Sequence, residues 1–366
     1  MTERPTVGPT RGTRGRGGST PRRVRGVTLL ELTISLGVGA TIAAAAMVLT
    51  SDFGRFHHRQ VGHLSLGHRL RSAAELLAAD IRNAGVGVGY TPSGRFGGLV
   101  GGPFTAPGGA TFEPAGRDVE TPDGTVRTDD LVLRRAIGAR RTILGLDPGS
   151  VEICRGLSLA AGDRVVASAR TGLSARTLRV QGAVEAACTL GRCMDGCTTV
   201  SFSDDPSYVS DPSALTRTFR GGDLFTDFQV VAWFVATDDD GEAALRRAEL
   251  EALETCATAG SSCGGEVAGG IETLQIRWAR FDEGLSSWVE LDPSQPVETF
   301  DRLRVDLELL GRARGDPKVG KTQPVVSQLE PGLCLPMPCG AERDSVPRLA
   351  LRTTVEVRNA GRLRIR

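Results

Sequence analysis

A long apolar segment with a single carboxylate near its start constrains this chain more than any other feature. It runs from Val27 to about Thr50, with Glu31 as its one acidic residue and no charge between Leu32 and Ser51. As a helix it would be about 36 Å long, enough to cross a bilayer with some tilt. A carboxylate inside such a segment costs about 2.5–3.5 kcal/mol on insertion scales, so Glu31 needs a charged partner or a function.

Residues 26–31 resemble the class III signal of type IV prepilins and pseudopilins. The family pattern is glycine, a hydrophobic residue that is usually Phe, Thr, Leu, a second aliphatic residue and Glu. The matching residues are Gly26, Val27, Thr28, Leu29, Leu30 and Glu31. The resemblance implies that a prepilin peptidase cleaves between Gly26 and Val27 and methylates the new amine. It also implies that Glu31 pairs with the terminal amine of a neighbouring subunit during assembly.

The alternative interpretation of the same segment is an ordinary secretory signal peptide or a plain membrane anchor. Small residues at Ala43–Ala46 offer a signal-peptidase site. However, the apolar run is longer than a usual signal core, and an acidic residue inside such a core is disfavoured. The pair Arg22-Arg23 is a weak twin-arginine signal, because Val24-Arg25-Gly26 is not an apolar run.

Residues 1–26 form a basic leader without apolar periodicity. The leader holds seven Arg and one Glu, and since the whole chain has a formal charge of +1, residues 27–366 carry −5. Arginines directly before a membrane helix hold that end in the cytoplasm. We therefore expect a single pass through the inner membrane, a cytoplasmic leader and a periplasmic head. The acidic balance of the rest does not indicate nucleic-acid binding.

Helical periodicity continues beyond the apolar run, over residues 51–85. Apolar residues recur at spacings of three and four, as Leu66, Leu70, Ala73, Leu77, Ile81 and Ala84, and predict one buried helix face. We expect Arg69, Arg71, Glu75, Asp80 and Arg82 to form the polar complement. The four histidines, between His57 and His68, are expected to be solvated near the membrane exit. The segment 69–85 resembles the second half of the long helix of PilW-type minor pilins, and patches at 271–278, 300–310 and 353–359 extend this resemblance.

The pattern of residues 86–366 predicts a β-rich head. Alternating segments indicate strands at 130–135, 150–154, 164–169, 177–181, 228–236, 244–250, 271–280, 288–291, 303–309 and 349–357. Asp238–Gly241 and 282–284 have the composition of hairpin turns. A calcium loop at the first turn is disfavoured, because Ala236 and Arg247 stand where the EF-hand pattern needs acidic ligands. The arginines at 134, 135, 140 and 141 are expected to be solvated strand ends.

Eight cysteines favour an exported head with disulfides over a zinc site. They are Cys154, Cys188, Cys193, Cys197, Cys256, Cys263, Cys334 and Cys339. No two have C-x-x-C spacing and the histidines lie far from them, which weakens zinc, whereas disulfides suit an oxidising periplasm. Eight cysteines allow 105 pairings. The local pairs Cys256–Cys263 and Cys334–Cys339 are favoured, and the other pairings stay open.

One motif suggests an enzyme. Residues 315–322, Gly-Asp-Pro-Lys-Val-Gly-Lys-Thr, satisfy the phosphate-loop pattern, with Lys321 and Thr322 in the phosphate and magnesium positions. The strand before it alternates apolar and charged residues, unlike a buried parallel strand, and Pro324 and Pro331 leave no room for the helix that must follow. With no histidine beyond His68, a serine or cysteine triad in the head is unsupported as well.

These patterns together predict an α+β fold, with one long N-terminal helix packed on an antiparallel β-rich head. We expect a minor pilin that helps initiate or cap a type IV pilus, without enzymatic activity, cofactor or metal. Its expected partners are the prepilin peptidase, other minor and major pilins, the inner-membrane assembly platform and membrane lipid. A J-type pseudopilin of a type II secretion system and an adhesive pilus-tip module are the alternatives. A nucleotide-hydrolysing enzyme would rest on residues 315–322 alone.

Overall fold

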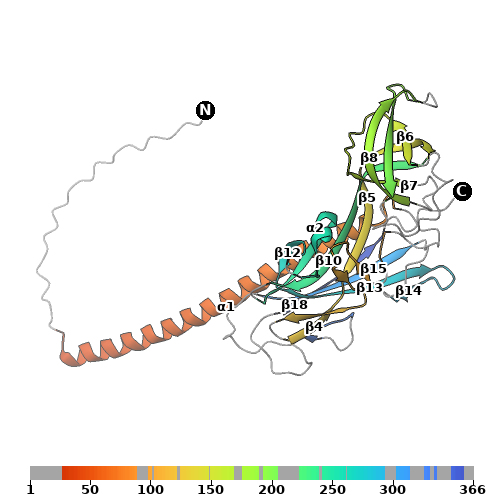
Figure 1. Cartoon of the computed structure of the whole chain (residues 1–366). Coiled ribbons are helices and arrows are strands. Elements are labelled where there is room, and N and C mark those ends of the chain that lie inside the picture. Colours follow the sequence, from red (N-terminus) through yellow and green to blue (C-terminus); the bar gives the residue numbers. More distant parts are fainter. Residues whose placement is uncertain are drawn as a thin grey trace, which may run out of the picture. The chain divides into compact units, whose positions relative to one another are not determined.

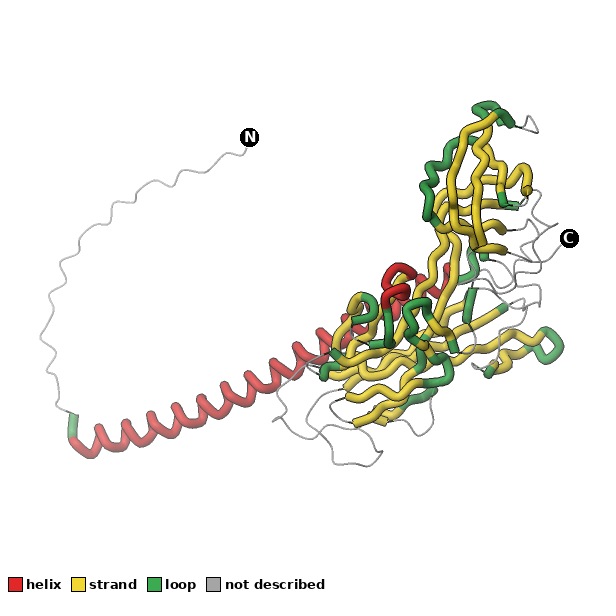
Figure 2. Tube along the Cα trace, viewed as in Figure 1, coloured by secondary structure: helices red, strands yellow, loops and turns green. Residues whose placement is uncertain are grey.

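The computed structural model describes residues 27–88, 98–100, 103–121, 124–147, 149–168, 175–188, 193–204, 222–238, 241–260, 262–292, 302–313, 325–329, 334–335 and 348–357. The chain divides into two units, residues 1–56 and 57–366. One long helix, α1 (Leu29–Asn83), contributes to both units, and most of the described chain after it consists of strands (Figures 1 and 2).

Local sequence explains where α1 begins and ends. Thr28 precedes the helix, and its Oγ1 accepts a hydrogen bond from the backbone N–H of Glu31 at 3.2 Å, as an N-cap residue does. No proline interrupts the following turns. After Asn83 the chain turns through Gly85 and Gly87, whose φ angles are +79° and +67°. Glycine adopts this left-handed conformation without steric cost, so the helix ends here.

An eight-stranded antiparallel sheet forms the larger part of the head. Its strands, in spatial order, are β12 (Gly265–Gly269), β11 (Ala243–Glu249), β10 (Asp223–Thr237), β5 (Leu131–Asp147), β6 (Ser150–Cys154), β9 (Cys197–Asp204), β8 (Ala175–Ala186) and β7 (Arg164–Ser168). Strand β7 also pairs with β10. The strands from β10 round to β7 therefore close into a six-stranded barrel, built on the far ends of the long strands β5 and β10 (Figure 1).

A second, four-stranded sheet has the order β14 (Ser287–Leu291), β13 (Ile271–Asp282), β15 (Leu303–Arg312) and β18 (Arg348–Glu356). Three short ribbons complete the described head: β1 (Phe104–Thr105) with β2 (Thr111–Phe112), β3 (Arg117–Thr121) with β4 (Gly124–Thr128), and β16 (Val325–Val326) with β17 (Cys334–Leu335). A single short helix, α2 (Leu250–Thr255), follows β11. All these strand pairs are antiparallel, which confirms the expected α+β class.

The head has three apolar clusters. The first joins the buried stripe of α1, including Leu70 and Leu77, to the inner faces of both sheets. Alternate residues of β15 from Leu303 to Leu309 belong to it, as the period of two along a strand requires. The second lies on the opposite face of β10, under the β1–β2 ribbon and α2, and the third fills the barrel. Strand β10 is thus buried on both faces, with Trp233 and Phe234 pointing to opposite clusters.

All ten strands expected from the sequence are present, and both expected turns lie inside hairpins. The sequence missed β9, β12, α2 and the three ribbons. Strand β9 is rich in Ser and Thr and β12 in Gly, so neither has the alternation that reveals a strand. The expectation that Asp80 and Arg135 are solvated was wrong, because Asp80 is buried and forms an ion pair with the half-buried Arg135.

Candidate functional site

The predicted processing segment forms the first turn of α1 and the residues before it. Val27 is 69 % exposed and Leu29 is 82 % exposed. Thr28 and Glu31 have the spacing of a capping box, and the Glu31 backbone N–H donates to Thr28 Oγ1. Gly26 lies outside the described residues. The segment therefore presents Glu31 on an unburied helix end.

The first half of α1 is exposed on all sides. An 18-residue window of the helix has a mean hydropathy of 2.0, and none of that window is buried; by length and composition it is able to cross a membrane. Hydroxyl groups in it donate back to helix carbonyls, as Ser35 does to Glu31 at 2.7 Å and Thr50 to Ala46 at 2.7 Å. Because lipid supplies no hydrogen-bond partners, such internal bonds suit this half to an apolar surrounding.

In the second half, Asp80 anchors α1 to three neighbouring strands. Its Oδ1 lies 2.9 Å from Arg135 Nη1 on β5. Its Oδ2 accepts hydrogen bonds from Arg247 Nε on β11 at 2.8 Å and from Trp233 Nε1 on β10 at 3.0 Å. The Asp80 side chain is only 11 % exposed. Since β5, β10 and β11 are adjacent, one carboxylate fixes the helix across three strands.

The two arginines of this anchor have further partners. Arg135 Nε donates to Gln229 Oε1 at 2.7 Å, and Arg247 also pairs with Glu249. Burial by itself would lower the pKa of Arg247, but hydrogen bonds to the Asp80 and Glu249 carboxylates outweigh it and raise the pKa. The Arg247 guanidinium therefore remains charged in this half-buried network. A buried ion pair of this kind fixes geometry more surely than it adds stability.

Sequence reasoning placed Asp80 among the solvated residues, although a signal was present. Asp80 follows Leu77 by three positions and precedes Ala84 by four, so it lies on the buried face of the helix. A carboxylate within an apolar stripe predicts a buried cationic partner. Which arginines supply it depends on the pairing of β5, β10 and β11, which the sequence does not reveal.

Three disulfides join six cysteines: Cys154–Cys193, Cys188–Cys197 and Cys256–Cys263. The locally expected pair Cys256–Cys263 is among them. The other expected local pair, Cys334–Cys339, lies outside the described part of the structure.

The first two disulfides lie at one end of the barrel. The Sγ atoms of Cys188, Cys193 and Cys197 are within 4.8 Å of one another, and each is already bonded in a disulfide. Cys154 and Cys197 sit opposite each other on β6 and β9 but bond to other partners. The two disulfides therefore tie β6 and the start of β9 to the segment that joins β8 and β9.

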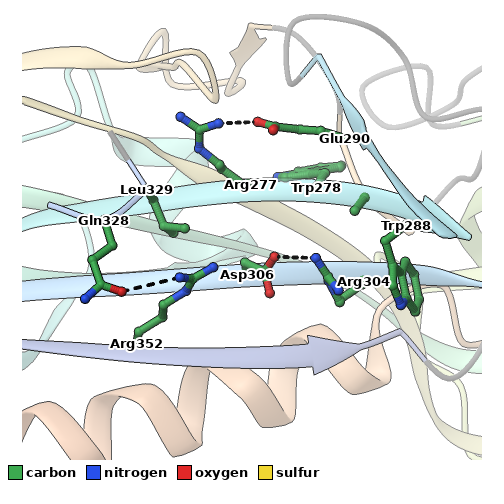
Figure 3. Close-up of a pocket in the computed structure, with 10 residues that line it drawn as sticks. Arg277, Trp278, Trp288, Glu290, Arg304, Asp306, Gln328, Leu329 and Arg352 are labelled. Atoms are coloured by element: carbon green, nitrogen blue, oxygen red, sulfur yellow. Dashed lines mark hydrogen bonds and ion pairs between the residues drawn. The ribbon is translucent and has the colours of Figure 1, made fainter. Parts of the chain in front are cut away.

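A cavity of about 310 Å³ lies on the four-stranded sheet, on the face turned away from α1 (Figure 3). Four of its charged side chains form ion pairs: Arg304 Nη2 lies 2.9 Å from Asp306 Oδ2, and Arg277 pairs with Glu290. The Arg304 guanidinium lies over the Trp288 ring, 4.8 Å from its centroid. The lining residues include no Ser, Cys, His or Lys, and both carboxylates of the lining, Asp306 and Glu290, are held by these arginines.

A second hollow, of about 450 Å³, is lined by Gly162, Asp163, Arg164, Asp227, Phe228, Gln229, Glu249 and Glu251. Burial raises the pKa of Asp227, and the nearby carboxylates of Glu249, Asp163 and Glu251 raise it further. A hydrogen bond from the Phe228 backbone opposes this shift. Asp227 thus carries an unfavourable charge at neutral pH.

Comparisons with known proteins give little independent information. No family model matches the chain, and no curated protein matches its sequence. Among solved structures, a type IV-like pilin from Thermus thermophilus is similar at 16% identity with a TM-score of 0.20, over 56% of this chain and 87% of that chain. A TM-score this low supports no conclusion about this chain.

Proposed function

We propose that this protein is a minor pilin of a type IV pilus, anchored in the inner membrane before it enters the fibre. The observation that carries the proposal is the exposed apolar part of α1 up to Thr50, which follows directly after the Gly26–Val27 junction and contains Glu31 as its one charged residue. A prepilin peptidase would cleave this junction and methylate Val27. Other pilins and the assembly platform are its proposed partners.

Glu31 supplies the register of assembly in this proposal. Cleavage exposes a new amine at Val27, and the amine of a neighbouring subunit meets Glu31 only when the two helices have the correct stagger. Wrong stagger leaves both charges unpaired in an apolar surrounding, which penalises misassembly. Residues Thr28, Leu29 and Leu30 form the contact surface next to this pair.

Substitution of Glu31 by Leu tests the proposal. The Glu31→Leu protein should insert into the membrane and be cleaved after Gly26, but should be absent from sheared fibres, and fewer pili should form. Glu31→Gln, which keeps the shape and removes the charge, should show the same defect. Wild-type amounts of either variant in fibres, with a normal number of pili, would refute the role of Glu31.

A J-type pseudopilin remains the second candidate, since the same helix would serve a type II secretion system. Deletion separates the two: loss of surface pili with normal protein secretion supports the pilus, and the reverse supports the secretion system. We propose no enzymatic activity. Lys321→Ala should leave piliation unchanged, and the purified chain should not bind ATP; the motif at 315–322 lies outside the described residues. Micromolar ATP binding that this substitution abolishes would contradict the proposal.

A further inference from the structure

Strand β18 ends the four-stranded sheet, and among the described strands only β15 pairs with it. It pairs with β15 from Arg348 to Glu356, and no described strand pairs with its other side. The backbone N–H and C=O groups along such an edge can form a ladder with an added strand. Partners that bind in this way gain affinity from the backbone and specificity from alternate side chains.

A hollow of about 230 Å³ lies between this edge and α1, and we name it the edge groove. The helix contributes the small residues Ala74 and Ala78, and β18 contributes Leu351 and Thr353. Both alanines are buried, whereas Leu351 is half-buried. Because small side chains occupy this side of the helix, the groove has room for the side chains of one more strand beneath α1.

Three exposed arginines surround the edge groove: Arg71 and Arg82 on α1, and Arg352 on β18. Within the described part of the chain, no carboxylate lies at ion-pair distance from any of them, and Glu75 is the single acidic residue of the groove. Arg352 has one weak contact, from its Nη1 to Gln328 Oε1 at 3.4 Å. By contrast, arginines in the head such as Arg135 and Arg348 have carboxylate partners.

We propose that the edge of β18 binds an extended acidic segment of a partner protein, which adds to the sheet as a fifth strand. Alternate side chains of that strand face opposite sides of the sheet. Carboxylates on one side would meet Arg71 and Arg82, and those on the other side would meet Arg352. The chain's own residues 358–366 are unsuitable, because they contain four arginines and no acidic residue. The proposal concerns the head alone and does not depend on polymerisation of the first half of α1.

The test uses the full chain in detergent and two short, amidated peptides, one with a Val-Glu-Glu repeat and one with a Val-Lys-Lys repeat, so that both faces of the added strand carry charges. The acidic peptide should bind and slow hydrogen exchange at the amides of β18, and added salt should weaken the binding because exposed charges are screened. The basic peptide should not bind. No protection of β18 by the acidic peptide, or equal binding of both peptides, would overturn the proposal and leave the arginines as protection against edge-to-edge aggregation.

Charge reversal tests whether the acidic peptide binds at the edge groove and not elsewhere on the head. The double variant Arg71→Glu, Arg82→Glu should bind the acidic peptide at least about tenfold more weakly, equivalent to 1.4 kcal/mol or more. Arg179→Glu, an exposed charge on β8, serves as the matched control and should bind as the wild type does. Unchanged thermal unfolding of the variants would show that the fold is intact. Equal affinity of the double variant and the wild type would contradict the proposal.

Discussion

The first half of helix α1 buries none of its apolar side chains, whereas the second half buries a full stripe of them against both sheets of the head. The acidic residues of the two halves also differ in whether they have a partner within the chain. Glu31 has no cationic partner within the described chain, but Asp80 has two arginines and a tryptophan N–H. The second half of the helix thus has its apolar and acidic side chains satisfied within the head, whereas those of the first half have no such contacts within the described chain. The substitutions below test how sharp this division is.

The largest expected effect comes from the buried stripe. Leu77 is fully buried in the first apolar cluster, so Leu77→Ala should destabilise the head by about 2–5 kcal/mol. Chemical unfolding of the full chain in detergent, followed by tryptophan fluorescence, measures this change. The matched control is Leu36→Ala at a side chain that is 73 % exposed, which should leave the unfolding of the head unchanged. If Leu77→Ala and Leu36→Ala destabilised the head equally, the difference between the two halves of α1 would be contradicted.

The Asp80 anchor should give the next largest effect. Asp80→Ala removes three hydrogen bonds and leaves Arg135 and Arg247 partly buried with fewer partners. We expect a loss of about 2–3 kcal/mol, the range for hydrogen bonds to charged groups. Asp52→Ala, in an exposed ion pair of the same helix, is the control and should change stability by less than about 1 kcal/mol. A variant Asp80→Ala as stable as the wild type would show that apolar packing alone holds the helix.

The Cys256–Cys263 disulfide should contribute slightly less. Its cysteines are seven positions apart, so the chain-entropy model gives about 2.4 kcal/mol for the double variant Cys256→Ala, Cys263→Ala. Unfolding under non-reducing conditions measures it. The first half of α1 contains no cysteine, so insertion into the membrane should be unaffected. Detection of Cys256 and Cys263 as free thiols in the exported protein would contradict the structure.

The smallest effect concerns Asp227. Because its pKa is raised in the folded state, the folded protein binds a proton more tightly there than the unfolded chain does. Stability is therefore lost as pH rises through the raised pKa. Asp227→Asn should raise the unfolding temperature slightly at neutral pH, and the gain should vanish as pH falls below the ordinary value of 3.8. A gain that is the same at all pH values would show that charge is not the cause.

The sequence predicted what local patterns determine and missed what strand pairing determines. The helix and ten strands follow from apolar periodicity, and the turn at Asp238 from its composition. The closure of the barrel by β7 and β10 brings together residues about 60 positions apart, and no local pattern specifies it. The arginine partners of Asp80 and the crossed disulfides Cys154–Cys193 and Cys188–Cys197 depend on the same pairings.

The signal at residues 26–31 differs from the head in this respect. It is local, so the sequence predicts its function without the fold, and the structure adds that Val27, Leu29 and Leu30 are exposed. In the proposed fibre, the partner of Glu31 lies on another subunit. The proposed role of the first half of α1 must therefore be tested on the processed or assembled protein.

The most direct test is the N-terminus of the mature protein in cells that contain a prepilin peptidase. Intact-mass measurement and N-terminal sequencing should give a chain that begins at Val27 with a methylated amine. The variant Gly26→Ala keeps the segment apolar and serves as a check, since a block in cleavage there would assign the cut to this junction. A mature chain that begins near Met47 would instead mean an ordinary signal peptide, and it would contradict the pilin account.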